Sequence, residues 1–335
     1  MITSQTTSAH LDGVLLGGID IGGTKCAVSI GRAWRDHVEV LEKQRFVTPA
    51  TPEQAIAAML GSLAELTQTY QPEAIGISCG GPLNSKQGLI LSPPSLPHWD
   101  RIDIVTPVMH QFDRPVGLQN DANACAIAEW KWGAGRGFDN LIFLTFGTGM
   151  GAGLILNGRL YAGSSDMAGE IGHVRMESDG PIGYGKAGSF EGFCSGQGIA
   201  RLAHTMAAQA LQSGRAPAFC PTVDALSTIS TERVALAAQA GDPLAIRIFE
   251  IVARELGRGL AILVDLLNPQ RIIIGSIYGR QRALLESVAL QTLQAEALPQ
   301  ALAVCEIVPA GLGEAVGDLA SLSVALDLLE NRKFA

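Results

Sequence analysis

A glycine turn between two apolar runs occurs twice in this chain, and it constrains the fold more than any other feature. Residues 14–30 read VLLGGIDIGGTKCAVSI, and residues 141–156 read LIFLTFGTGMGAGLIL. Each segment predicts a strand, a tight turn and a second strand. The Gly-Thr pair of the second turn follows that of the first by 124 residues. A repeat of this kind indicates two similar domains.

The segments after each hairpin alternate between helix and strand signals. Thr51 and Gln54 have capping-box spacing, and Pro52 suits the first helical position, so a helix is expected at residues 51–70. Alternating helices and strands predict an α/β fold with largely parallel sheets. Further helices are expected at residues 105–112, 121–130, 197–212, 231–240 and 243–267, and further strands at residues 74–79, 116–119 and 271–274.

The chain has 335 residues, which favours two domains at roughly 100–200 residues each. We expect an N-terminal α/β domain at residues 14–132, joined by a C-terminal helix at residues 314–331. A second α/β domain is expected at residues 133–313, with one cleft between the two domains. Residues 1–13 are expected to form a flexible tail.

Composition argues against several classes of protein. A net charge of −8 does not suit a general nucleic-acid binder, which needs a basic face to neutralise phosphates. No apolar run approaches the roughly 18–20 residues of a membrane span, and the polar start lacks the pattern of a signal peptide. Six cysteines without a CxxC pair indicate reduced thiols, so we expect a cytoplasmic protein.

The two glycine turns are candidate phosphate sites. Backbone N–H groups and a threonine hydroxyl can bind phosphate oxygens, and an aspartate at a strand end can hold Mg²⁺ through water. An ordinary β-turn is the alternative, but two equivalent turns favour phosphate. The residues concerned are Asp20, Gly22, Gly23, Thr24 and Lys25 in the first turn, and Gly147, Thr148 and Gly149 in the second. Moreover, 18 of the 39 glycines fall within residues 133–198, which indicates backbone that approaches a ligand closely.

Five polar residues outside the turns are candidates for substrate chemistry. Asn120 and Asp121 stand where a strand meets a helix, so Asp121 is either a helix cap or a general base at the edge of a sheet. Phosphoryl transfer to a hydroxyl needs such a carboxylate, and the phosphate turns favour the base. Two interpretations are open for Glu170, His173 and Glu191. They are solvated or structural side chains, or they supply hydrogen bonds to a polyol such as a sugar.

Taken together, these residues resemble the ROK family (repressor, open reading frame, kinase) of glucokinase-like sugar kinases, in the actin-like ATPase superfamily. The resemblance extends from about residue 16 to residue 329. The motifs that carry it are DIGGTK (20–25), SCGGP (78–82), NDANACAIAEW (120–130), FGTGMGAGLILNGRLYAG (146–163), AGEIGHV (168–174), SFEGFCSG (189–196) and RIIIGS (271–276). It implies duplicated, ribonuclease H-like domains that face each other across a cleft.

The resemblance also implies roles for individual residues. Asp121 corresponds to the base that accepts a proton from the sugar hydroxyl. The two turns would hold the phosphates of ATP, and Gly275 would lie beside the adenosine. The reaction implied is Mg²⁺- and ATP-dependent phosphorylation of a hexose, usually at the 6-hydroxyl. The positions that correspond to sugar contacts are Gly81, Ser95, Asn120, Asp121, Glu170, His173 and Glu191.

Three departures from the family pattern matter. Many members bind a structural zinc with three cysteines and a histidine, but Ile182, Tyr184 and Ser189 stand at the cysteine positions here. Tetrahedral zinc needs four ligands, so we expect no zinc, with packing of Tyr184 and Phe190 holding the segment instead. A serine, Ser95, stands where asparagine is frequent. A serine also follows Gly275 in place of a second glycine.

Several alternatives stay open. A sugar-sensing regulator of the same family would need a DNA-binding domain before the first turn, and only 19 residues precede Asp20. A pseudokinase and an N-acetylhexosamine kinase are further candidates. The acidic balance favours ATP over polyphosphate as the donor. The expected partners are a small sugar and ATP, with neither nucleic acid nor membrane. A homodimer is left open.

Overall fold

The computed structural model describes residues 13–332, so the expected flexible tail lies outside the described residues except for Gly13. The chain divides into two compact units. Unit 1 combines the chain up to Ala124 with the chain from Gly317 on, and unit 2 is Cys125–Val316. Among the described residues no helix is long and apolar enough to cross a membrane. All six cysteines lie in this part and are free thiols.

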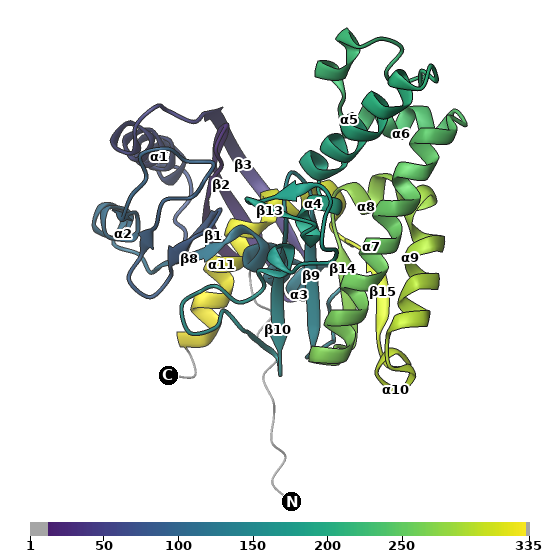
Figure 1. Ribbon diagram of the computed structural model, residues 1–335. Helices are drawn as coiled ribbons and strands as arrows, with labels where there is room; N and C mark the ends of the chain where they lie inside the picture. Colours follow the sequence, from purple (N-terminus) through teal and green to yellow (C-terminus); the bar gives the residue numbers. More distant parts are fainter. Residues whose placement is uncertain (1–12, 333–335) are drawn as a thin grey trace, which may run out of the picture. The chain divides into compact units, whose positions relative to one another are not determined.

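Unit 1 is built on a five-stranded sheet in the order β3-β2-β1-β4-β8. The first three strands are antiparallel, and β4 and β8 run parallel to β1. Figure 1 labels β1, β2, β3 and β8 of this sheet. The strands are β1 (Val14–Ile21), β2 (Lys25–Ala33), β3 (Val38–Val47), β4 (Ala74–Cys79) and β8 (Val116–Asn120). A smaller sheet contains β5 (Leu83–Asn84), β6 (Leu89–Ile90) and β7 (Ile102–Asp103).

The helix α1 (Pro52–Thr67) forms for the reasons that its sequence suggests. Thr51 is extended, and its hydroxyl accepts a hydrogen bond from the Gln54 N–H at 3.4 Å. Met59 and Leu63 are buried in the core of unit 1. A second helix, α2 (Val105–Phe112), ends at Asp113 in the left-handed conformation. The expected helices at residues 51–70 and 105–112 are therefore confirmed, the first with an earlier end.

A row of three glycines crosses the sheet of unit 1, and the last helix, α11 (Val316–Arg332), packs closely against it. Gly18, Gly76 and Gly117 are direct neighbours on β1, β4 and β8. A Cβ at Gly76 would lie 1.9 Å from the Ser321 carbonyl oxygen, and one at Gly18 would lie 2.4 Å from the Ser321 Oγ. A side chain at Gly76 would push the backbone of α11 away, so close approach requires glycine there, whereas Gly117 is less tight, with a Cβ 3.2 Å from the Val324 side chain.

Unit 2 repeats the strand order of unit 1. Its sheet runs β11-β10-β9-β14-β15, with three antiparallel strands followed by two parallel ones. The strands are β9 (Leu141–Phe146), β10 (Met150–Leu156), β11 (Arg159–Leu160), β14 (Arg271–Ile274) and β15 (Glu306–Pro309). The shared order confirms the duplicated α/β architecture that the two hairpins predict.

Helices supply most of the core of unit 2. The longest, α7 (Pro243–Leu267), begins at Asp242, whose carboxylate accepts the Ala245 N–H at 2.9 Å. Around it are α4 (Phe190–Phe193), α5 (Gly196–Gln212), α6 (Thr231–Gln239), α8 (Ile277–Arg280), α9 (Arg282–Glu296) and α10 (Pro299–Leu302). Short 3₁₀ turns are η1 (Ile171–His173), η2 (Asp224–Thr228) and η3 (Gly313–Ala315).

The helix α3 (Asp121–Trp132) carries the chain from unit 1 into unit 2. Near its end the buried carboxylate of Glu129 accepts three backbone N–H groups, from Ala134 at 2.7 Å, Gly311 at 3.0 Å and Leu312 at 2.9 Å. These bonds satisfy a charge that would otherwise be costly to bury. They also fix the segment that precedes α11.

Candidate functional site

The carboxyl ends of three parallel strands bring several predicted residues of unit 1 to one sheet edge. Asp20 lies near the end of β1, Gly80 and Gly81 follow β4, Asn120 is the last residue of β8, and Asp121 follows it. Because β4 lies between β1 and β8, these positions are neighbours. A Cβ at Gly81 would lie 3.0 Å from the Asn120 Nδ2. Ligands of α/β proteins bind at such edges.

The first glycine turn presents unused backbone donors. Its own bond joins the Gly22 N–H to the Lys25 carbonyl, and the Thr48 hydroxyl donates to the Gly22 carbonyl at 2.6 Å. The N–H groups of Gly23 and Thr24 have no acceptor anywhere in the described part of the chain. Successive free N–H groups make an anion-binding concavity. Sequence reasoning missed Thr48, which no motif marks.

Ser95 lies against this turn. A Cβ at Gly23 would lie 2.4 Å from the Ser95 carbonyl oxygen, and one at Gly80 would lie 3.8 Å from the Ser95 hydroxyl. The serine is exposed. The structure thus brings together Gly23, Gly80 and Ser95 within unit 1.

Asp20 has an unusual environment for a carboxylate. Desolvation by burial raises its pKa from 3.8 to about 6, and the nearby charge of Asp121 adds to the shift. Lys43 and Arg45 oppose it. Both cations are paired with Asp318 of α11, with Arg45 Nη2 and Asp318 Oδ1 at 2.8 Å. Asp20 therefore lies in a cluster with four other charged groups of unit 1.

Asp121 begins α3 with an accessible side chain. Its Oδ1 and the Asn120 Oδ1 both accept the Ala122 N–H at 2.8 Å, so the two residues cap the helix together. Desolvation by the surrounding protein raises the pKa of Asp121, while the N–H groups of Ala122 and of Asp121 itself lower it. An accessible carboxyl group whose pKa is raised has the character of a general base.

The second glycine turn lies in unit 2 beside a large cavity. The Gly196 N–H donates to the Gly147 carbonyl at 2.7 Å, and a Cβ at Gly147 would lie 3.5 Å from the Ser276 Oγ. A cavity of about 850 Å³ opens here, within the usual range for small ligands. Its lining residues are Gly147, Thr148, Gly196, Gln197, Ala200, Ile229, Ser230, Thr231, Glu232, Leu236, Gln239, Ser276, Ile277, Arg280 and Gln281.

Sequence reasoning found only part of this cavity. Gly275 is buried directly before two lining residues, Ser276 and Ile277. Gln239 and Gln281 were not predicted, and their amides are joined by a hydrogen bond of 2.9 Å. Apolar side chains such as Ile229 and Leu236 line it together with hydroxyl and amide groups, a mixture that suits a flat base carrying polar substituents.

The three predicted sugar contacts of unit 2 come from two short helices that touch β10. Glu191 lies on α4, and its Oε2 accepts the Met150 N–H at 3.2 Å. Glu170 directly precedes η1, His173 is its last residue, and both are exposed. A Cβ at Gly172 would lie 3.3 Å from the Cβ of Glu191, so η1 and α4 are in contact. The structure therefore gathers all three residues beside the second turn.

The segment in which zinc ligands are frequent forms a small hairpin here, β12 (Ile182–Gly183) and β13 (Lys186–Ala187). Ile182 and Tyr184 are exposed, whereas Ser189 is buried and caps α4 by accepting the Gly192 N–H. Phe190 is fully buried in the core of unit 2. Between residues 13 and 332, no three or more His, Cys, Asp or Glu side chains form a group suited to a metal ion.

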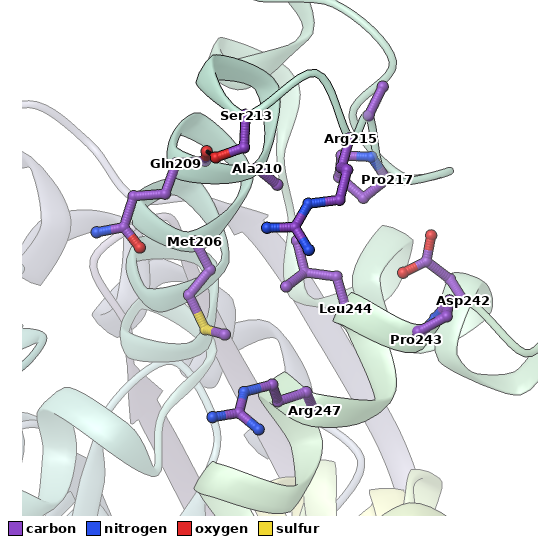
Figure 2. Close-up of a pocket in the computed structure, with 11 residues that line it drawn as sticks. Met206, Gln209, Ala210, Ser213, Arg215, Pro217, Asp242, Pro243, Leu244 and Arg247 are labelled. Carbon is purple, nitrogen blue, oxygen red and sulfur yellow. Dashed lines mark hydrogen bonds between the residues drawn. The ribbon is translucent and has the colours of Figure 1, made fainter.

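A second hollow in unit 2, of about 630 Å³, contains none of the predicted residues. It lies between the end of α5, the loop after it and the start of α7, and Figure 2 shows Met206, Arg215 and Arg247 bordering it. The Asp242 carboxylate at its edge is already bound to backbone N–H groups of Ala218 and Ala245. We do not assign this hollow to the candidate site.

Comparison with known proteins identifies the family and the fold. The ROK family profile matches residues 16–327. A glucokinase of Streptomyces coelicolor is 32% identical over 260 residues, which cover 77% of this chain and 80% of that protein. The solved structure of a ROK family glucokinase from Streptomyces griseus in complex with glucose and AMPPNP is 29% identical, with a TM-score of 0.73 over 93% of this chain and 99% of that one.

A regulator is also similar. The solved structure of a ROK family transcriptional regulator, a homologue of the E. coli MLC protein, is 25% identical, with a TM-score of 0.81 over 94% of this chain and 78% of that one. The matches to enzyme and regulator share the same fold, with its duplicated actin-like ATPase architecture. On sequence and structure together, the chain belongs to the ROK family.

Proposed function

We propose that this protein is an ATP-dependent sugar kinase that phosphorylates a hexose hydroxyl, first of all the 6-hydroxyl of glucose or a related hexose. The observation that carries the proposal is the sheet edge of unit 1. There the accessible carboxylate of Asp121 lies near Asp20 and a glycine turn with free N–H donors. The similarity to glucokinases supports the same reading.

In this proposal Asp121 is the general base. It accepts the proton of the sugar hydroxyl while the γ-phosphoryl group moves in line to the oxygen. A pKa raised by desolvation brings this carboxyl closer to the working pH, which favours proton transfer. The sugar contacts are proposed to be Gly81, Ser95, Asn120, Asp121, Glu170, His173 and Glu191.

ATP is the proposed phosphoryl donor. The turns at residues 22–25 and 147–149 offer backbone N–H groups to phosphates, and the cavity beside Gly147 has the size and lining for an adenosine. A polyphosphate donor has no base and would make no use of the apolar side chains of this cavity, such as Ile229 and Leu236. Mg²⁺ carried by ATP neutralises phosphate charge, and Asp20 has the donor type to hold it through water. No zinc is assigned.

A kinase assay with the full chain tests the proposal. Glucose, mannose, fructose, N-acetylglucosamine and N-acetylmannosamine are each offered with Mg²⁺ and either ATP or polyphosphate. We expect ATP turnover with at least one hexose and a sugar 6-phosphate as product. A zinc-selective chelator with Mg²⁺ in excess should leave the rate unchanged. Failure to phosphorylate any sugar of the panel contradicts the proposal.

A sugar-sensing protein without catalysis is the second candidate, favoured by the similarity to the ROK transcriptional regulator. Such a protein binds a sugar without consuming ATP. Calorimetric titration with the same panel separates the two functions, because binding without turnover identifies the sensor. An N-acetylhexosamine kinase would instead show turnover with the acetylated sugars alone.

A further inference from the structure

Three cationic side chains converge on the backbone of the β12–β13 hairpin and of the η1 turn before it. The Arg175 Nη1 donates to the Ala187 carbonyl at 2.7 Å. The Lys186 Nζ donates to the His173 carbonyl at 2.8 Å. The Arg201 Nη1, from α5, donates to the Ile182 carbonyl at 2.5 Å. We call Arg175, Lys186 and Arg201 the carbonyl clamp.

The clamp acts on a segment that has little other regular structure. Each strand of the hairpin has two residues, and the turn between them places Tyr184 at φ 44° and Gly185 at φ 75°. A two-residue turn with both φ values positive is the usual connection of a tight hairpin. An isolated hairpin of this size is not stable in water, so other bonds must hold it.

Charge-assisted hydrogen bonds suit this task. A bond from an ammonium or guanidinium group is stronger than one between neutral groups. Each of the three clamp cations donates to a backbone carbonyl oxygen, Arg201 donates in addition to the Gln197 side-chain oxygen at 3.2 Å, and among the described residues none pairs with a carboxylate. No ion pair therefore competes with their bonds to the backbone.

The clamp connects directly to the proposed sugar contacts. Lys186 binds the carbonyl of His173 itself, and the ring of Tyr184 meets the His173 ring edge-on with centroids 6.0 Å apart. On the other side the Phe190 N–H donates to the Val174 carbonyl at 2.8 Å, next to Glu191. Movement of the hairpin would therefore move the backbone at His173 and loosen the start of α4.

We propose that Lys186 is a positioning residue of the sugar site, because its ammonium group fixes the backbone at His173, with Arg201 fixing the hairpin to α5. This inference rests on the proposed function, in which His173 contacts the sugar. Lys186 itself touches no reacting atom. Its loss changes the orientation of His173, and with it the affinity for the sugar, while ATP binding and the base Asp121 are unaffected.

Enzyme kinetics on the full chain test this role. Lys186→Met should raise KM for the preferred sugar about tenfold, the effect of losing about one charge-assisted hydrogen bond. KM for ATP should stay within about twofold. Lys186→Arg should restore most of the affinity because it keeps a cationic donor. The matched control is Lys86→Met, which removes an exposed lysine in the β5–β6 turn and should change neither KM.

Hydrogen exchange provides a readout that does not depend on activity. In Lys186→Met and in Arg201→Met, the amides of residues 171–191 should exchange at least tenfold faster than in the wild type, with the core of unit 1 unchanged. If the wild type phosphorylates no sugar, the proposed function fails while the exchange result still decides the clamp. Unchanged exchange, or a KM for sugar equal to that of Lys86→Met, overturns the inference.

Discussion

The two glycine turns occupy equivalent positions in their units, each between two antiparallel strands, but they contact different residues. In unit 1, residues 22–25 separate the paired ends Ile21 and Cys26, and in unit 2, residues 147–149 separate Phe146 and Met150. The first turn lies against Ser95 and near two aspartates. The second lies against Gly196 and opens into the cavity of about 850 Å³.

The different surroundings of the two turns show how two copies of one fold can take on different functions. Backbone N–H groups at a strand-turn-strand come with the fold, so each copy retains them after duplication. Carboxylates, amides and cavity walls come from loops and helices that diverge freely. In our proposal unit 1 supplies the base and unit 2 supplies the nucleotide cavity.

The largest expected effect concerns the carboxylate of unit 1. Asp121→Asn should lower kcat by about 10²–10⁴-fold, the usual contribution of a positioned base, with sugar affinity largely retained. A coupled assay measures kcat, and calorimetry measures sugar binding. Asp113→Asn is the matched control, because this exposed residue ends α2 in a conformation that asparagine tolerates. Full turnover of Asp121→Asn would exclude it as the base.

The next expected effect is on the free energy of unfolding. Replacement by asparagine should stabilise the protein at Asp20 and destabilise it at Asp318, although both aspartates belong to one charged cluster. The pKa of Asp20 is about 6 in the folded protein, above its ordinary 3.8, so the folded state binds a proton more readily than the unfolded chain between these values. Ionised Asp20 therefore costs free energy above pH 6. Asp20→Asn should stabilise by about 1–3 kcal/mol at pH 8, and the gain should vanish near pH 4.

Asp318 is the internal comparison for this prediction. Desolvation opposes ionisation, but hydrogen bonds from Lys43 and Arg45 prevail and lower its pKa. Its contribution is present above the unfolded pKa and is lost as the pH falls through the folded pKa. Asp318→Asn should therefore destabilise at pH 8. Urea unfolding across pH 4–8 measures both variants, and a shift of the same sign in both would contradict the assignment.

Added methyl groups distinguish the two turns sterically. A Cβ at Gly23 would lie 2.4 Å from the Ser95 carbonyl oxygen, whereas one at Gly147 would lie 3.5 Å from a serine hydroxyl. Gly23→Ala should cost about 1–3 kcal/mol, as overpacking does. Gly147→Ala should change the free energy of unfolding by less than about 0.5 kcal/mol. Urea denaturation without ligand measures both, and equal losses would refute the difference in packing.

The smallest effect concerns Ser276 beside the second turn. Its φ of 58° and ψ of −113° belong to a region that glycine adopts readily and other residues rarely. Ser276→Gly should raise the free energy of unfolding by about 1 kcal/mol, since relief of strain exceeds the entropy that glycine adds to the unfolded chain. Asn268→Gly is the control, because asparagine already tolerates its left-handed conformation. Equal gains in the two variants would argue against strain at Ser276.

Much of the fold could be predicted from the sequence because local signals agree with the final structure. The strands β4 and β14 and the helix α7 have the expected bounds. The edge strands β3 and β15 were not predicted. The first of these has charged residues between its apolar ones, because an edge strand needs few buried contacts. The glycine row packs against α11, and the residues in contact are about 200–300 positions apart in the sequence. No local sequence pattern can predict such a contact.

The candidate site, too, has residues that the sequence predicts and residues that only the three-dimensional structure reveals. Asp20, Asp121 and the two turns stand at strand ends, so adjacency in sequence already points to them. Lys186 and Arg201 act on carbonyl oxygens, and every residue offers a carbonyl, so no spacing identifies their targets. Gln239 and Gln281 meet only because α6 and the loop before α9 converge in space.

The glycine row of unit 1 also determines when each half of the chain can finish folding. Its cover, α11, is synthesised after the whole of unit 2. At about 5–20 residues per second, the roughly 190 residues of unit 2 take about 10–40 s to emerge. During that interval the face of the first sheet that α11 will cover stays exposed to solvent and to chaperones. Unit 2 is continuous in sequence, so the half that is made second is the first to be complete.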